Sequence, residues 1–170
     1  VIIIGAGAAG MMSAIEAGKR GRKVLLVDHY KKIGEKIRIS GGGRCNFTNI
    51  HTNPNKFLSQ NSKFVRSALS QYTQNDFINL INKHEIKFHE KKLGQLFCDY
   101  SAQQIVEMLL KECKLANITI YKEFIVKDII KENDQYFVST ETDRYSSESL
   151  VIATGGLSVP KIGATSFGYE

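Results

Sequence analysis

Apolar and polar positions in the first part of the chain predict a strand, a helix and a second strand. The β-branched run at residues 1–4 is typical of a buried parallel strand. A stretch rich in Ala, Met, Ile and Glu at 11–19 is typical of a helix, and the apolar run at 24–27 predicts another strand. Strands joined by a helix in this way indicate an α/β fold built on a parallel sheet.

The later part of the chain predicts a further helix and strands, with an antiparallel meander among them. Apolar residues at helical spacing favour the helix, and turn-forming Asn-Asp and Thr-Asp pairs separate the short alternating segments of the meander. The elements expected there are a helix at 101–114, strands at 118–121 and 150–153, and meander strands at 125–131, 136–140 and 144–146.

The region between these blocks, residues 51–100, is expected to be a mostly helical excursion, with helices at 61–71 and 75–84. No apolar run is long enough to cross a bilayer. The three cysteines are odd in number and far apart, which fits neither a disulfide framework nor a zinc site. We therefore expect no metal, no membrane and a cytoplasmic protein.

A glycine-rich loop joins the first predicted strand to the first helix, and an acid follows the second strand. Gly5 permits a tight turn, Gly7 lets the backbone approach a pyrophosphate, and Gly10 lets the helix pack closely on the strand. The free N–H groups at the helix start favour an anion. Asp28 can accept a ribose hydroxyl and would repel a 2′-phosphate, which argues against NADP. This motif alone does not separate FAD from NAD.

Positive charge is concentrated close to this loop. Between Lys19 and Arg44 the chain carries nine Lys or Arg residues against Asp28 and Glu35, in a protein of net charge +6. Such a stretch suits an anionic ligand such as a pyrophosphate. No serine-protease grouping or paired acids are visible, and the histidines are expected at the surface. These are His29, His51, His84 and His89.

The run Ser-Gly-Gly-Gly-Arg-Cys-Asn-Phe-Thr-Asn at 40–49 is the most distinctive feature of the sequence. Consecutive glycines allow the backbone to approach a ligand closely, and Arg44 offers a fixed fork of donors for an anion. Ile50 stands where a redox-active pair would need its second cysteine, so no disulfide can form within this run. Cys45 either contacts a cofactor or packs in the interior, and we favour packing.

The order of the predicted elements resembles the FAD domain of glutathione-reductase-type flavoproteins. In those proteins the meander replaces a crossover helix, and an Ala-Thr-Gly segment such as 153–155 returns beside the dinucleotide. The resemblance implies that Val126, on the first meander strand, holds the adenine through its backbone; a plain core valine is the alternative reading.

Several motifs closely resemble the BaiN/YhiN-type family of NAD(P)/FAD-dependent oxidoreductases, also described as aminoacetone oxidase family flavoproteins. They are Lys-Ile-Gly-Glu-Lys at 32–36, the 40–49 run, Gly-Gln-Leu-Phe at 94–97, and 153–165 with its Ala-Thr-Gly-Gly start. Two departures are Cys98 in place of Pro, and Ser166-Phe167 in place of Gly-Asp. Family members continue into an inserted substrate domain and a final FAD segment, so this chain is expected to be an N-terminal portion.

The resemblance implies a flavoprotein that transfers two electrons between FAD and a small organic substrate, with NAD(P)H or O2 as the other partner. We expect one FAD/NAD(P)-binding domain over 1–170: a dinucleotide-binding unit with its Gly-rich loop at 1–50, the excursion at 51–100, and the third strand, meander and Ala-Thr-Gly-Gly strand at 101–170. The expected cofactor contacts are Gly5, Gly7, Ala8, Ala9, Gly10, Asp28, His29, Lys36, Ser40, Gly41, Gly42, Arg44, Cys45, Asn46, Val126, Ala153, Thr154, Gly155 and Gly156. The sequence assigns no catalytic residue.

Two alternative functions remain open. The first is a non-catalytic, truncated dinucleotide-binding fragment. The second is an FAD-dependent protein that modifies tRNA or another RNA, suggested by the fold resemblance and a pI of about 9.2. Because the charge gathers near the presumed pyrophosphate loop, we expect a small-molecule substrate and no nucleic acid.

Overall fold

The computed structural model describes residues 1–157 and 165–169, and they form two compact units. Unit 1 comprises Val1–Ile37 and Leu109–Glu170, and unit 2 comprises Arg38–Met108. The single FAD/NAD(P)-binding domain stays a prediction, and the excursion has a sheet of its own in unit 2. Residues 158–164 of the motif that starts at Ala153 lie outside the described residues.

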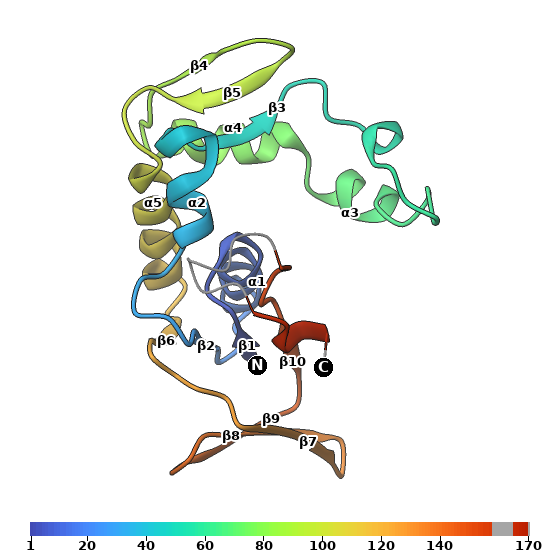
Figure 1. Ribbon diagram of the computed structural model, residues 1–170, viewed down its shortest axis with the longest axis vertical. Helices are drawn as coiled ribbons and strands as arrows, with labels where there is room; N and C mark the ends of the chain where they lie inside the picture. The colour runs from blue at the N-terminus through green and yellow to red at the C-terminus, as the bar shows by residue number, and fades with distance from the viewer. Residues whose placement is uncertain (158–164, 170) are drawn as a thin grey trace. The chain divides into compact units, whose positions relative to one another are not determined.

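Unit 1 is built on a four-stranded parallel sheet in the order β10-β1-β2-β6. Figure 1 shows these strands side by side, with the first helix next to them. The sheet confirms the predicted order of strand, helix and strand, followed by a third and a fourth parallel strand. Its elements are β1 (Ile2–Ile4), α1 (Ala8–Lys19), β2 (Leu25–Val27), β6 (Thr119–Tyr121) and β10 (Leu150–Ile152).

The β-branched run at the N-terminus forms an inner strand because both of its faces are covered. Ile3 is fully buried, and Met11 and Ile15 of α1 are buried as well. Gly18 lets α1 approach the chain that leads into β6, since a Cβ there would lie 2.6 Å from the carbonyl oxygen of Ala116. The small residue Gly18 therefore allows the close approach of α1, and the branched residues of β1 fill the interior of the sheet.

The meander follows β6 in unit 1 as an antiparallel sheet of β7 (Asp128–Glu132), β8 (Gln135–Ser139) and β9 (Arg144–Ser147). Val138 of β8 joins Ile2, Ile4, Val27 and Phe124 in one buried cluster. The predicted Rossmann-like fold with a meander is thereby confirmed. The first meander strand begins later than predicted, because residues 125–127 are in irregular structure before β7.

Unit 2 contains a three-stranded antiparallel sheet in the order β3-β5-β4, together with short helices. The expectation of a mostly helical excursion is therefore corrected: its predicted first helix starts only at Arg66, and two strands lie in its last part. The elements are η1 (Ser40–Gly43), β3 (Asn46–Asn49), η2 (Pro54–Lys56), α3 (Arg66–Gln71), α4 (Gln74–Lys83), β4 (Phe88–Glu90) and β5 (Gln95–Cys98). The boundaries between the units fall within two helices, α2 (Glu35–Ile39) and α5 (Gln103–Leu115). The short helix η4 (Phe167–Tyr169) belongs to unit 1.

The core of unit 2 is aromatic. Phe47 of β3 packs edge-on against Phe88 of β4, with ring centres 5.4 Å apart, and lies 6.1 Å from the ring of Phe77 on α4. Thr73 and Asp76 form a reciprocal capping box that fixes the start of α4. No helix among the described residues is long and apolar enough to span a membrane.

Candidate functional site

The loop between β1 and α1 has the shape of a phosphate-binding turn. Gly5 has a φ of +104°, and a Cβ there would lie 2.4 Å from the carbonyl oxygen of Ala153. A Cβ at Gly10 would lie 1.8 Å from the carbonyl oxygen of Gly5. The fold itself therefore requires glycine at both positions.

Gly7 differs from the other two glycines because nothing in the described protein excludes a side chain there. A Cβ at Gly7 would have no described atom within 4 Å, and its φ of −83° is open to any residue. The open space adjoins the N-terminus of α1, where Gly7 is the N-cap and offers no side-chain cap. The backbone at Gly7 is therefore open to the close approach of a ligand that the sequence motif predicts.

The electrostatics of this helix terminus favour an anion. The first turn of α1 carries no acidic residue. The hydrogen bonds of the helix begin with the N–H of Met11, which donates to Gly7 O at 3.0 Å. The N–H groups of the first turn have no partner within the helix, and they lie at the positive end of the helix dipole. Ala8, Ala9 and Gly10 thus lie where a pyrophosphate can accept their hydrogen bonds.

Asp28 lies directly beside the glycine loop, as its position after β2 predicts. Its Oδ2 accepts the N–H of Ala6 at 2.7 Å, and its Oδ1 accepts the N–H of Tyr30 at 2.8 Å. Each carboxylate oxygen can accept a second hydrogen bond, so a ribose hydroxyl remains a possible donor. The half-exposed His29 lies next to it, with Nδ1 3.5 Å from Asp28 Oδ1.

The segment after β10 forms the other side of the loop in unit 1. The N–H of Ala153 donates to Ile4 O at 2.8 Å, which continues the pairing of β10 with β1. Lys36 Nζ donates to the carbonyl oxygen of Gly156 at 2.7 Å, and Gly155 has a left-handed φ of +73°. The parallel sheet thus brings together three predicted segments, because the carboxyl ends of β10, β1 and β2 are neighbours.

The short helix η4 also packs against this segment, which the sequence motifs did not indicate. A Cβ at Gly168 would lie 2.5 Å from Thr154 Oγ1, and the hydroxyl of Tyr169 lies 3.0 Å from where a Cβ at Gly156 would be. Phe167 is partly buried against the core cluster of unit 1. The Phe167 that replaces a family residue therefore has a packing role.

Val126 lies in the irregular segment before β7, packed against the core cluster that includes Ile4 and Val27. A backbone contact to an adenine stays a prediction for this residue. This packing alone is enough to explain an aliphatic residue at position 126.

In unit 2 the Ser40–Gly43 run forms a tight turn before β3. Gly41 and Gly42 adopt left-handed φ values of +57° and +67°, and the N–H of Cys45 closes the turn on Ser40 O at 3.0 Å. A Cβ at Gly41 would lie 2.7 Å from the ring of Phe97 and from the N of Asn46. At Gly42 it would meet no described atom within 4 Å. Gly42 therefore leaves the backbone open to a ligand, as at Gly7.

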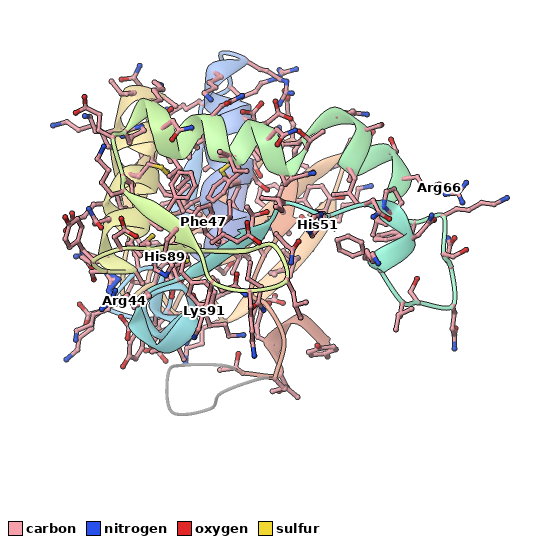
Figure 2. All side chains as sticks on the ribbon, turned by 90° about the horizontal axis from the view of Figure 1, so that it is seen from above. Arg44, Phe47, His51, Arg66, His89 and Lys91 are labelled. Atoms are coloured by element: carbon pink, nitrogen blue, oxygen red, sulfur yellow. The ribbon has the colours of Figure 1, made fainter. Side chains whose placement is uncertain are left out.

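Arg44 extends from this turn to the β3-β5-β4 sheet, where its guanidinium donates to the carbonyl oxygen of Asp99. The Asp99 carboxylate pairs with His89, at 2.7 Å from Nδ1, and His89 stacks on Phe97 with ring centres 6.4 Å apart. Lys91 Nζ lies 5.1 Å from the centre of the same ring. Figure 2 labels Arg44, His89 and Lys91 near one another in unit 2. No motif in the sequence connects His89 with Arg44.

The cysteines are free and buried. Burial raises the pKa of the Cys45 thiol, raises that of Cys98 to about 12 and raises that of Cys113 to about 11. A thiol is a poor nucleophile in its protonated form, so these residues pack rather than react at neutral pH. Cys45 is only 6% exposed, in line with the expectation that it packs in the interior. Among the described residues no three His, Cys, Asp or Glu side chains gather to hold a metal ion.

The sequence profile of the HI0933-like protein Rossmann domain matches residues 1–170 of this chain. The chain belongs to the HI0933-like family. Its N-terminal β–α–β unit, with Asp28 tied to the glycine loop, is the part of the Rossmann domain where dinucleotides bind in this fold class.

Two relatives share about half of their aligned residues with the chain. It is 54% identical to the ribosomal RNA dihydrouridine synthase of Escherichia coli over 99% of its own length, and 48% identical to the enzyme of that name from Haemophilus influenzae over 99%. It is 24% identical to a 3-dehydro-bile acid delta(4,6)-reductase of Clostridium scindens over 98%. The chain spans 42%, 43% and 41% of these relatives, respectively.

Solved structures confirm the fold class. The 3-ketosteroid-delta4-(5alpha)-dehydrogenase from Rhodococcus jostii RHA1 superposes with a TM-score of 0.64 at 11% identity, covering 91% of this chain and 45% of that chain. At this identity the likeness shows a shared fold. The BaiN/YhiN-type resemblance holds at the level of the HI0933-like family.

Proposed function

We propose that this chain is the FAD-binding part of a flavin-dependent reductase that converts uridine to dihydrouridine in ribosomal RNA. The proposal rests on 54% and 48% identity to two enzymes named ribosomal RNA dihydrouridine synthase. The chain spans 42% of the first of them, so the activity belongs to a longer protein. An RNA substrate would replace the small molecule and revise the expectation of no nucleic acid.

The residues of unit 1 fit FAD. Gly7 leaves open the space that a pyrophosphate would occupy, and the first turn of α1 has no acid to repel it. Asp28 has acceptor capacity left for the adenosine ribose. Its negative charge disfavours the 2′-phosphate of NADP at this position. The single observation that supports the cofactor most directly is the open Gly7 beside the anchored Asp28.

Bound FAD, once reduced by NAD(P)H, would supply the hydride for a carbon–carbon double bond. Reduction of uridine in this way adds one hydride and one proton across the C5–C6 bond, and oxidises NAD(P)H to NAD(P)⁺. In this account the N–H groups at Ala8 and Ala9 bind the pyrophosphate, and Lys36 holds the loop at Gly156.

A small-molecule reductase is the second candidate. It is favoured by 24% identity to a 3-dehydro-bile acid delta(4,6)-reductase over 98% of the chain. That enzyme is by its name a reductase, so the class of reaction is the same. The 24% identity is half or less of the identity to the RNA-named relatives, and we therefore rank this candidate second.

Two measurements on the protein test the proposal separately. An absorbance spectrum from 300 to 550 nm, after FAD is added and the excess is removed, reports whether the cofactor site forms. Nucleosides of deproteinised ribosomal RNA, analysed by mass spectrometry after incubation with NADH or NADPH, report dihydrouridine. Retained flavin with no dihydrouridine favours the small-molecule reductase, whereas a colourless protein favours a fragment without redox activity.

A further inference from the structure

Residues 36–75 contain no Asp or Glu, yet they carry six Lys or Arg residues. Three of these, Lys56, Lys63 and Arg66, lie in what we call the 56–72 segment, which runs from Lys56 to Tyr72 in unit 2. The whole of unit 2 carries nine Lys or Arg against five Asp or Glu, a net charge of +4. The excess of positive charge lies in unit 2 more than in unit 1, which carries the remaining +2.

The basic side chains of the 56–72 segment are exposed and lack acidic partners. Among the described residues no carboxylate forms an ion pair with Lys56, Lys63 or Arg66, whereas several basic residues of unit 1 are paired, such as Lys127 with Glu141 at 3.1 Å. Unpaired charges of one sign produce a positive potential that attracts a polyanion.

Large apolar side chains alternate with these charges and are exposed to solvent. Phe64, between Lys63 and Arg66, is 78% exposed, and Leu58 is 97% exposed. Phe57 and Tyr72 are exposed to 42% and 37%. A flat, exposed aromatic ring between cations is the arrangement on which unpaired nucleic-acid bases stack, with the phosphates held by the neighbouring charges.

Local hydrogen bonds, rather than burial, shape the segment. Asn61 Oδ1 accepts the N–H of Lys63 at 3.1 Å, and the N–H of Phe64 donates to Asn61 O at 3.1 Å. These bonds fix the backbone at Lys63 and Phe64 and leave the ring of Phe64 exposed to solvent. Figure 2 labels Arg66 on the part of unit 2 that extends away from Phe47 in the core and from Arg44 and His89.

We propose that the 56–72 segment is a docking surface for single-stranded RNA, with Lys63 and Arg66 neutralising phosphates and Phe64 stacking on an unpaired base. The inference rests on the proposed function, which requires an RNA substrate, and names the part of the chain that binds it. A duplex keeps its bases stacked on one another and offers no free face to Phe64. The segment therefore selects unpaired RNA over duplex RNA.

The test is fluorescence anisotropy of the FAD-loaded protein with a labelled 16-nucleotide oligouridine and with a 16-base-pair RNA duplex, over a range of KCl concentrations. The charge-reversal pair K63E/R66E should weaken oligouridine binding by at least about tenfold and lower the slope of log K against log salt by about 1.4. Phe64→Ala should weaken binding about tenfold with an unchanged slope, because stacking involves no counterion release.

The matched control is K111E/K114E, which changes the net charge equally on exposed positions of α5 outside the segment. It should leave oligouridine affinity within about twofold of the unaltered protein, since these two lysines take no part in the contacts proposed for the segment. Far-UV circular dichroism and the flavin spectrum confirm that each variant is folded. Phe64 is 78% exposed, so its truncation leaves no cavity.

Equal affinity of the unaltered protein for oligouridine and duplex, or oligouridine binding unchanged in both segment variants, would overturn the inference. Binding of the segment to phosphatidylglycerol vesicles, with none to oligouridine, would overturn it in favour of a membrane surface. If K63E/R66E binds RNA with normal affinity and still forms dihydrouridine, the docking surface is rejected and the proposed function stands. If the segment variants lose oligouridine binding but the unaltered protein forms no dihydrouridine, the proposed function is rejected and the docking surface stands.

Discussion

The backbone N–H of Ala6 donates to Asp28 Oδ2 at 2.7 Å, which joins the acid after β2 to the glycine loop after β1. The second oxygen of Asp28 accepts the N–H of Tyr30 at 2.8 Å, so the carboxylate is held at both oxygens. A carboxylate that is already oriented loses little freedom when a ribose hydroxyl binds to it. The same two bonds also shape the protein before any cofactor is present.

Asp28→Asn should weaken FAD binding by about 10- to 100-fold, because a hydrogen bond to a charged acceptor contributes roughly 1.5–3 kcal/mol. Quenching of flavin fluorescence on titration measures the affinity. Asp134→Asn, in the exposed turn between β7 and β8, removes the same charge and should leave the affinity unchanged. Equal weakening by both substitutions would show that only net charge matters.

Gly7→Ala and Gly10→Ala should separate cofactor binding from folding. The Gly10 variant places a Cβ 1.8 Å from Gly5 O, and this overpacking should cost about 1–3 kcal/mol of unfolding free energy or more. The Gly7 variant meets no described atom and should change stability by less than about 1 kcal/mol, yet it should lose most FAD affinity. Thermal unfolding without FAD, beside FAD titration, measures the two effects. A Gly7 variant that binds FAD normally contradicts the assignment.

The buried thiols predict a loss of stability at alkaline pH. The pKa of Cys98 rises from an ordinary 9.0 to about 12 and that of Cys113 to about 11, mainly through burial. Above pH 9 the unfolded chain releases these protons while the folded chain keeps them. The free energy of unfolding should therefore fall between about pH 9 and 11, by at most about 1.4 kcal/mol per pH unit for each thiol.

Urea unfolding at pH 8 and pH 10.5 measures this decline, and Cys98→Ala provides the comparison. The variant loses one of the two titrating thiols, so its stability should fall less steeply with pH, whatever its starting value. Identical declines in the two proteins would show that other groups, such as lysines and tyrosines, account for the alkaline effect.

Local patterns predicted unit 1 well because its signals lie close together in the sequence. The β-branched run, the three glycines and Asp28 are all within the first 28 residues, and their roles depend on neighbours in one β–α–β unit. The meander was predicted from its turns; Asn133 and Asp134 indeed adopt left-handed φ values of +47° and +60°. Its first strand was placed too early because Val126 packs as a core residue outside the strand.

Unit 2 was less predictable because its sheet joins segments that are distant in sequence. Asn46 pairs with Phe97, and nothing local marks the short strands β4 and β5, with Lys91-Lys92 between them. The His89–Asp99 pair follows from the pairing of β4 with β5, so it could not be found without the fold. The exposure of the basic and apolar side chains at 56–72 is likewise known only from the structure.

The most direct test of the central claim is the dihydrouridine content of ribosomal RNA, purified from cells that lack the enzyme and incubated with the FAD-loaded protein and NAD(P)H. The account predicts dihydrouridine at a defined position, formed in step with NAD(P)H oxidation and lost in Asp28→Asn at limiting FAD. Ribosomal RNA that stays unreduced while the protein retains flavin and oxidises NAD(P)H with a small enone would contradict the account and establish the small-molecule reductase instead.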